Sequence, residues 1–68
     1  MTIFEVTFKY HLLDGKTSSK TFNSERWWDE CHEQNERFIQ RNFKDKGIEL
    51  KYYEVINTAN FDVKDFDY

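Results

Sequence analysis

Two residues that could form a nucleophile and its base, Cys31 and His32, are neighbours in this chain. A thiol beside an imidazole can perform nucleophilic catalysis when the two side chains meet at hydrogen-bond distance. Successive side chains of an α-helix point about 100° apart, so two neighbours on a helix do not meet in this way. The pair therefore predicts a small buried cysteine beside a flanking histidine, since free cysteine usually behaves as a small apolar residue.

The remaining chemically capable residues are scattered or regularly spaced. His32 and Glu36 are four residues apart, and His11 is the other histidine of the chain. Structural zinc sites usually have four ligands at characteristic spacings, so these residues predict no metal site. Glu30, Glu33 and Glu36 recur every three residues, which is typical of the solvated face of a helix, and general acid–base catalysis would need an enclosing pocket. The sequence predicts no catalytic, cofactor-binding or metal-binding residue, and a protein that is not an enzyme.

Composition limits the architecture. The chain has 68 residues, with seven Phe, four Tyr and two Trp but no proline. This length predicts a single domain over residues 1–68 that buries only about 60% of its unfolded surface. So many aromatic residues exceed what one small core holds, and some are expected at the surface. A lone cysteine and no apolar run near the ~20 residues of a membrane helix favour a soluble, cytoplasmic protein.

A hairpin is predicted at the start of the chain. Apolar and polar residues alternate over residues 2–12, which is typical of a strand with one buried face. Asp14-Gly15 is a strong signal for a tight hairpin turn into a second strand over residues 16–22. That second strand is rich in Thr, Ser and Lys and has little to bury, so we expect it at an edge of the sheet and the first strand at the centre.

A long helix follows over residues 24–46. Asn23 or Ser24 can cap its start, and Gly47 can end it in the left-handed conformation. The first half of this segment carries five acids and one base, and the second half four bases and one acid. This distribution agrees with the helix dipole, which favours acids near the N-terminus and bases near the C-terminus.

The apolar arc of this helix is about 160° wide by the helical period, and Asn35 and Asn42 lie at its centre. Either the asparagines are buried and hydrogen-bonded, or one flank of the arc faces outward. We therefore expect Trp27 and Trp28 to differ, one in the core and the other partly exposed. An exposed flank would be available to a partner protein or to a second copy in a homodimer. Its residues are Trp28, Ile39 and Phe43.

The last third of the chain predicts further strands. A third strand begins at Ile48, and its alternation breaks near Tyr52, which predicts a β-bulge. Residues 57–60 predict a turn, and residues 61–66 a short fourth strand. The alternative for residues 61–68 is an acidic, aromatic tail. The predicted fold is α+β with the order ββαβ(β): one helix packed on a three- to four-stranded, mostly antiparallel sheet.

The chain opens with Met1-Thr2-Ile3 and alternating apolar residues, and continues with a glycine-containing turn, a Thr-rich second strand, a helix ending at Lys46-Gly47 and a closing hairpin. This pattern resembles the immunoglobulin-binding domains of streptococcal proteins G and L. The resemblance implies a four-stranded sheet of order 2-1-4-3 under one helix. A longer helix and an acidic last strand differ from that family, so its binding activity is not carried over. In size and composition the chain also resembles small phage-encoded proteins that bind and inhibit host enzymes.

The net charge of −3 is concentrated in residues 48–68, which hold five acids and two bases. Such a charge favours a basic protein surface over duplex DNA as the partner. In the last eight residues the acids alternate with aromatic side chains. Aromatic anchors commonly supply affinity, and carboxylates supply steering toward Arg and Lys. The predicted partner contacts in this segment are Asp62, Asp65, Phe66, Asp67 and Tyr68.

These observations predict a small non-catalytic protein-binding module that acts as an inhibitor or accessory protein. It would occlude a basic surface of its partner, and would act as a nucleic-acid mimic if that surface normally binds nucleic acid, as in a phage-type inhibitor of a host enzyme. The alternative is a binder of single-stranded nucleic acid. In that case Phe8, Tyr10, Tyr52 and Tyr53 would stack on bases. Few Lys or Arg residues lie between these aromatics, so direct nucleic-acid binding is the less favoured alternative.

Overall fold

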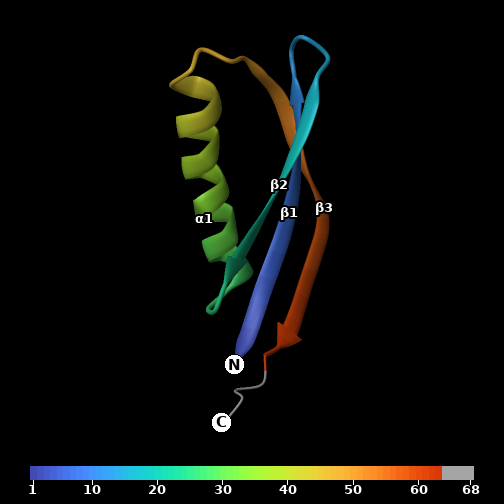
Figure 1. Ribbon diagram of the computed structural model, residues 1–68, viewed down its shortest axis with the longest axis vertical. Helices are drawn as coiled ribbons and strands as arrows, with labels where there is room; N and C mark the ends of the chain where they lie inside the picture. The colour runs from blue at the N-terminus through green and yellow to red at the C-terminus, as the bar shows by residue number, and fades with distance from the viewer. Residues whose placement is uncertain (64–68) are drawn as a thin grey trace.

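The computed structural model of the protein describes residues 1–63, and one central strand organises it (Figure 1). This strand, β1 (Thr2–Leu12), lies between β2 (Thr17–Ser24) and β3 (Leu50–Asp62). Both neighbours pair with it antiparallel, so the sheet has the order β2-β1-β3. The predicted α+β fold is confirmed, with the first strand central and the second at an edge.

The β1–β2 hairpin forms for local reasons. Gly15 has φ +88°, a left-handed conformation that glycine adopts without steric penalty. The carboxylate of Asp14 accepts a hydrogen bond from the backbone N–H of Lys16 at 2.8 Å, which closes the turn. At the opposite end of the sheet the backbone N–H of Val63 donates to the carbonyl of Met1 at 2.8 Å.

The helix is shorter than predicted. Helix α1 (Trp28–Ile39) continues into a π-helical turn, η1 (Gln40–Lys44), so the helical segment is 28–44 rather than 24–46. It starts late because Ser24 still belongs to β2, where it pairs with Phe4. As predicted, Gly47 follows the helical segment with a positive φ of 71°.

The core lies between the helix and the β1–β2 half of the sheet. Its fully buried side chains are Val6, Phe8, Tyr10 and Cys31, each with an exposed fraction of 0%. Ile39 and Phe43 are 6% exposed and belong to the same cluster. The prediction of an outward-facing flank was therefore wrong for Ile39 and Phe43. The π-helical turn explains part of this, because its wider turn rotates Phe43 less per residue and brings it back toward the sheet.

The two asparagines of the apolar arc hydrogen-bond within the fold. Asn35 is 1% exposed, and its Oδ1 accepts a hydrogen bond from the hydroxyl of Tyr10. Asn42 donates from Nδ2 to the carbonyl oxygen of Phe38 at 3.0 Å. Burial raises the pKa of the Tyr10 hydroxyl to about 12, and neighbouring Tyr53 adds to the shift. Tyr10 therefore stays a neutral donor over the ordinary pH range.

The third strand is longer and more continuous than predicted. Residues 57–60, expected to form a turn, pair with β1, so that Asn57 lies opposite Thr7. The register of the β1–β3 pairing shifts at two places, where Ile56 and Lys51 have no partner on β1. The irregularity at Lys51 confirms the bulge predicted near Tyr52, and the one at Ile56 was not predicted.

Only part of the predicted fourth strand falls within the described residues. Phe61 and Asp62 continue β3 instead of starting a new strand, and residues 64–68 lie outside the described part. Residues 1–63 thus form a three-stranded sheet. Helix α1 packs on β1 and β2, which leaves the helix side of β3 largely uncovered (Figure 1).

Candidate functional site

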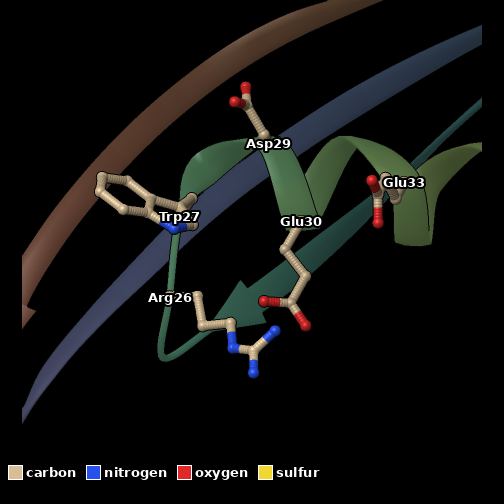
Figure 2. A pocket seen from close by; sticks show the side chains of 5 residues that line it. All are labelled: Arg26, Trp27, Asp29, Glu30 and Glu33. Atoms are coloured by element: carbon tan, nitrogen blue, oxygen red, sulfur yellow. The ribbon is translucent and has the colours of Figure 1, made fainter.

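A shallow hollow at the N-terminal end of α1 combines an exposed indole with carboxylates. Figure 2 shows Glu30 extending to the same side as Arg26, while Trp27 and Asp29 point in other directions from the first turn of the helix. The side chain of Trp27 is 67% exposed, the highest value among the large apolar residues of the described chain. The residues that line the hollow are Arg26, Trp27, Asp29, Glu30 and Glu33.

The turn between β2 and α1 sets the position of this hollow. The hydroxyl of Ser24 donates to Oε2 of Glu30 at 2.7 Å and accepts from the backbone N–H of Arg26 at 3.0 Å. These two hydrogen bonds join the end of the strand to the first turn of the helix. Trp27 then stands in an extended conformation, with φ −147°, immediately before the helix. Its side chain therefore does not follow the apolar stripe of the helix.

Both tryptophans rest on the same phenylalanine of β1. The ring of Trp27 stacks on Phe4 with 6.4 Å between centroids and 18° between planes. Trp28 meets Phe4 edge to face at 4.9 Å, and its Nε1 donates to the carbonyl oxygen of Ala59 in β3 at 3.2 Å. Trp28 is 39% exposed. The two tryptophans differ in environment as expected, but the expectation that one is buried in the core was wrong.

The charge around the indoles is mainly negative. Asp29 and Glu30 lie in the first turn of α1, where the helix dipole favours negative charge. One turn later Oε2 of Glu33 lies 3.8 Å from Nη2 of Arg37, but both side chains are mostly exposed. Such an exposed ion pair holds its partners weakly and leaves the carboxylate available to another cation. The hollow is thus suited to contact positively charged groups beside an apolar one.

The predicted partner contacts are distributed unevenly over the structure. Trp28 lies beside the hollow, and Asp62 lies at the same end of the sheet, where its Oδ1 accepts from the hydroxyl of Thr2 at 2.8 Å. Ile39 and Phe43 are in the core, as described above. Sequence reasoning missed Trp27 and its neighbouring carboxylates as a surface. The predicted contacts outside the described residues are Asp65, Phe66, Asp67 and Tyr68.

The cysteine and histidine of α1 do not form a reactive pair. The thiol of Cys31 is buried against the backbone carbonyl oxygens of Phe4 and Phe22, at 3.6 and 3.5 Å. Burial raises the pKa of the Cys31 thiol, which keeps it in the unreactive protonated form. His32 packs edge to face on Phe8, with 5.1 Å between ring centroids. Within residues 1–63 no group of three or more His, Cys, Asp or Glu side chains could hold a metal ion.

The aromatic residues considered for base stacking do not share a surface. Phe8 and Tyr10 are fully buried beneath the helix. Tyr53 pairs with Tyr10, and Tyr52 pairs with His11, so the two neighbours point to opposite faces of the sheet. On the face away from the helix, Tyr52 stacks on His11 with 4.2 Å between centroids. These four rings therefore form no continuous exposed row on one face of the sheet.

Comparisons with protein-family models, curated proteins and solved structures find no match for this chain. No helix in the described part of the chain is long and apolar enough to cross a membrane. What distinguishes the site is its own chemistry, an exposed indole supported by Phe4 beside the carboxylates of Asp29, Glu30 and Glu33.

Proposed function

We propose that this protein is a small, non-catalytic protein-binding module that covers a basic surface of a partner protein. The observation that carries the proposal is Trp27, whose indole is 67% exposed while it stacks on Phe4. Tryptophan is enriched among the residues that dominate binding energy in protein interfaces. A ring already supported on one face loses less conformational freedom on binding than a free one. Trp27 is therefore suited to act as an anchor.

The surrounding acids suit a partner rich in Lys and Arg. Asp29, Glu30 and Glu33 line the hollow beside the anchor, with one base, Arg26, among them. Carboxylates around an apolar anchor raise the association rate toward a positive surface and disfavour negative ones. We propose that Trp28 and Asp62 extend this contact surface, together with the acidic and aromatic residues that follow β3 in sequence. Those residues are Asp65, Phe66, Asp67 and Tyr68.

Occlusion is the proposed mode of action. A protein that covers the basic groove of a nucleic-acid-binding enzyme excludes the nucleic acid, because both compete for the same cations. The protein would then be an inhibitor that mimics the charge of nucleic acid, with its aromatic rings contributing contacts that phosphates lack. We place this activity in the cytoplasm, since the chain has a single, free cysteine.

The first experiment compares Trp27→Ala with Leu13→Ala as baits for capture of partners from a cell lysate. Leu13 is also exposed but follows the end of β1, whereas both tryptophans contact Phe4 near its start. We expect Leu13→Ala to retain every partner that the natural sequence captures. Loss of an anchor of at least ~2 kcal/mol weakens binding by about 30-fold, so Trp27→Ala should lose the specific partner. Retention of that partner by Trp27→Ala would contradict the anchor role.

The second experiment measures association rates with the captured partner at low and at about 0.15 M salt, where charges are screened beyond ~8 Å. The double variant Asp29→Asn, Glu33→Gln should associate more slowly and depend less on salt. Asp14→Asn, at the hairpin turn, serves as the charge control. The triple variant Asp62→Asn, Asp65→Asn, Asp67→Asn tests the C-terminal extension of the surface. Unchanged rates in both acidic variants would exclude a steering role.

A further inference from the structure

The outer edge of β3 pairs with no other strand in the described part of the chain. β1 pairs with one edge of this 13-residue strand, and no strand within residues 1–63 pairs with the other. An edge strand presents unpaired N–H and C=O groups that can pair with another strand, and natural proteins usually protect such edges with charges, proline, β-bulges or short length. The bulges of β3 lie at Lys51 and Ile56, so its regular pairing with β1 is unbroken over residues 57–62. Long edges without these protections are therefore candidates for pairing between molecules.

The two edges of this sheet differ in protection. The edge strand β2 is polar, rich in Ser and Thr, and carries Lys20. In β3 the seven residues from Val55 to Phe61 include no charged side chain, and the chain has no proline. Exposed apolar side chains accompany this stretch on both faces of the strand. They are Tyr52, Tyr53, Val55, Ile56, Phe61 and Val63.

The helix leaves the same strand uncovered on its own side. Tyr53 and Val55 pair with the buried residues Tyr10 and Phe8, yet they are 41% and 44% exposed. A hollow between the helical segment and β3 is lined by Ile39 and Tyr53, among others. The core side of the sheet thus extends one strand beyond the helix that covers it.

We propose that the outer edge of β3 pairs antiparallel with β3 of a second copy of this chain, forming a dimer with a continuous six-stranded sheet. An antiparallel strand is self-complementary about a two-fold axis, so one surface suffices for a closed, symmetric interface. Because the stretch from Val55 to Phe61 carries no charge, two copies can meet there without burying an unpaired ion. A basic partner of the kind proposed above would gain no charge complementarity along these seven residues.

Such a dimer would cover the apolar side chains that β3 exposes in the single chain. A two-fold axis perpendicular to the sheet places both helices on the same face, with the two β3 strands between them. Tyr53 and Val55 of both copies would then form the floor between the helices. The exposed apolar side chains of β3 would contribute to the roughly 800 Å² that each partner buries in a standard interface.

Asp62, proposed above as a partner contact, ends β3, so the two surfaces adjoin there, but the anchor Trp27 lies before α1 and outside the open edge. Sedimentation of the full chain from micromolar to sub-millimolar concentration provides the test. We expect the natural sequence to approach twice the 8.4 kDa chain mass. A lysine in the paired stretch, Ile56→Lys, should weaken dimerisation by at least about 30-fold. Ser18→Lys on the β2 edge is the matched control and should leave it unchanged.

Two further measurements keep the test decisive. Val55→Lys places a charge on the helix side of the same stretch and replaces Ile56→Lys if that variant does not keep the helical circular dichroism spectrum. Hydrogen exchange of the natural protein should show protection of β3 amides that increases with concentration, while β2 amides do not respond. A chain that stays monomeric overturns the proposal. A dimer that tolerates both lysines but dissociates in Trp27→Ala overturns it too, because the contact would then lie at the tryptophans.

Discussion

The hydrogen bond between Tyr10 and Asn35 lies in the centre of the core and allows a quantitative test. Both side chains are buried, and the tyrosine hydroxyl donates to Oδ1 of the asparagine. Nδ2 of Asn35 is buried without a hydrogen-bond partner among the described residues. Tyr10→Phe removes the donor, and Asn35 then has its whole amide buried and unpaired.

The expected magnitude follows from this arrangement. A buried polar group left without its partner destabilises a protein by about 1–3 kcal/mol, so Tyr10→Phe should lower the free energy of unfolding by that amount. Replacing both partners by apolar groups of similar shape is nearly neutral. The double variant Tyr10→Phe, Asn35→Leu should therefore be more stable than Tyr10→Phe alone, because it also removes the unpaired Nδ2.

A double-mutant cycle tests this. It compares the urea unfolding of the natural protein, of Tyr10→Phe, of Asn35→Leu and of the double variant. We expect a coupling energy of about 1–2 kcal/mol between the two positions, which are in direct contact. The matched control is Tyr52→Phe, whose hydroxyl lies on an exposed residue and whose loss should change stability by less than ~0.5 kcal/mol. Equal, small effects of Tyr10→Phe and Tyr52→Phe would refute the view that the buried hydrogen bond supports the core.

Three other predictions follow from described contacts. The pKa of Tyr10 is raised from 10.0 to about 12, so the folded state holds the phenol proton more tightly than the unfolded state does. The resulting contribution to the free energy of unfolding is fully present below pH 10 and is lost as the pH rises toward 12. The loss reaches about 3 kcal/mol by linkage, and alkaline urea titrations should show that Tyr10→Phe lacks it. Cys31 should react with an alkylating reagent only as fast as the protein opens, since its thiol is buried and protonated; fast labelling of the folded protein would contradict this. Ser24→Ala removes two hydrogen bonds at the start of α1 and should destabilise the protein by about 1 kcal/mol in thermal unfolding, whereas Ser19→Ala should not.

Local signals in the sequence predicted the first half of the fold. The alternation of β1 and the Asp14-Gly15 turn are local features with strong conformational preferences, and both were confirmed. Residues 57–60 have turn-forming composition, yet pairing with β1 holds them in a strand. Such pairing joins segments about 50 residues apart, and sequence propensity does not contain it. The broken alternation near Tyr52 predicted the bulge at Lys51, whereas the bulge at Ile56 depends on the pairing with β1.

The candidate site was predicted less well for a related reason. A helix starting at residue 24 would place Trp27 on the same face as Cys31, and this led to the expectation of a buried tryptophan. Ser24 remains in β2 and the helix begins at Trp28. The helical period of about 100° per residue therefore does not give the direction of the Trp27 side chain. A four-residue error in the start of the helix thus underlies the wrong expectation that one of the two tryptophans is buried. The π-helical turn had the opposite effect on Phe43, which was expected outside and is buried.

The backbone contact between Met1 and Val63 has a mechanical consequence. These residues lie side by side at one end of the antiparallel β1–β3 pair, joined by hydrogen bonds between their backbones. A force applied between them would load the ladder one hydrogen bond at a time from that end, because antiparallel bonds run perpendicular to the strands. The pair would therefore unzip under low force instead of resisting in shear. An unfolding enzyme that pulls Met1 and Val63 apart would meet little mechanical resistance. β1 would separate from β3, and the core around Tyr10 would then open.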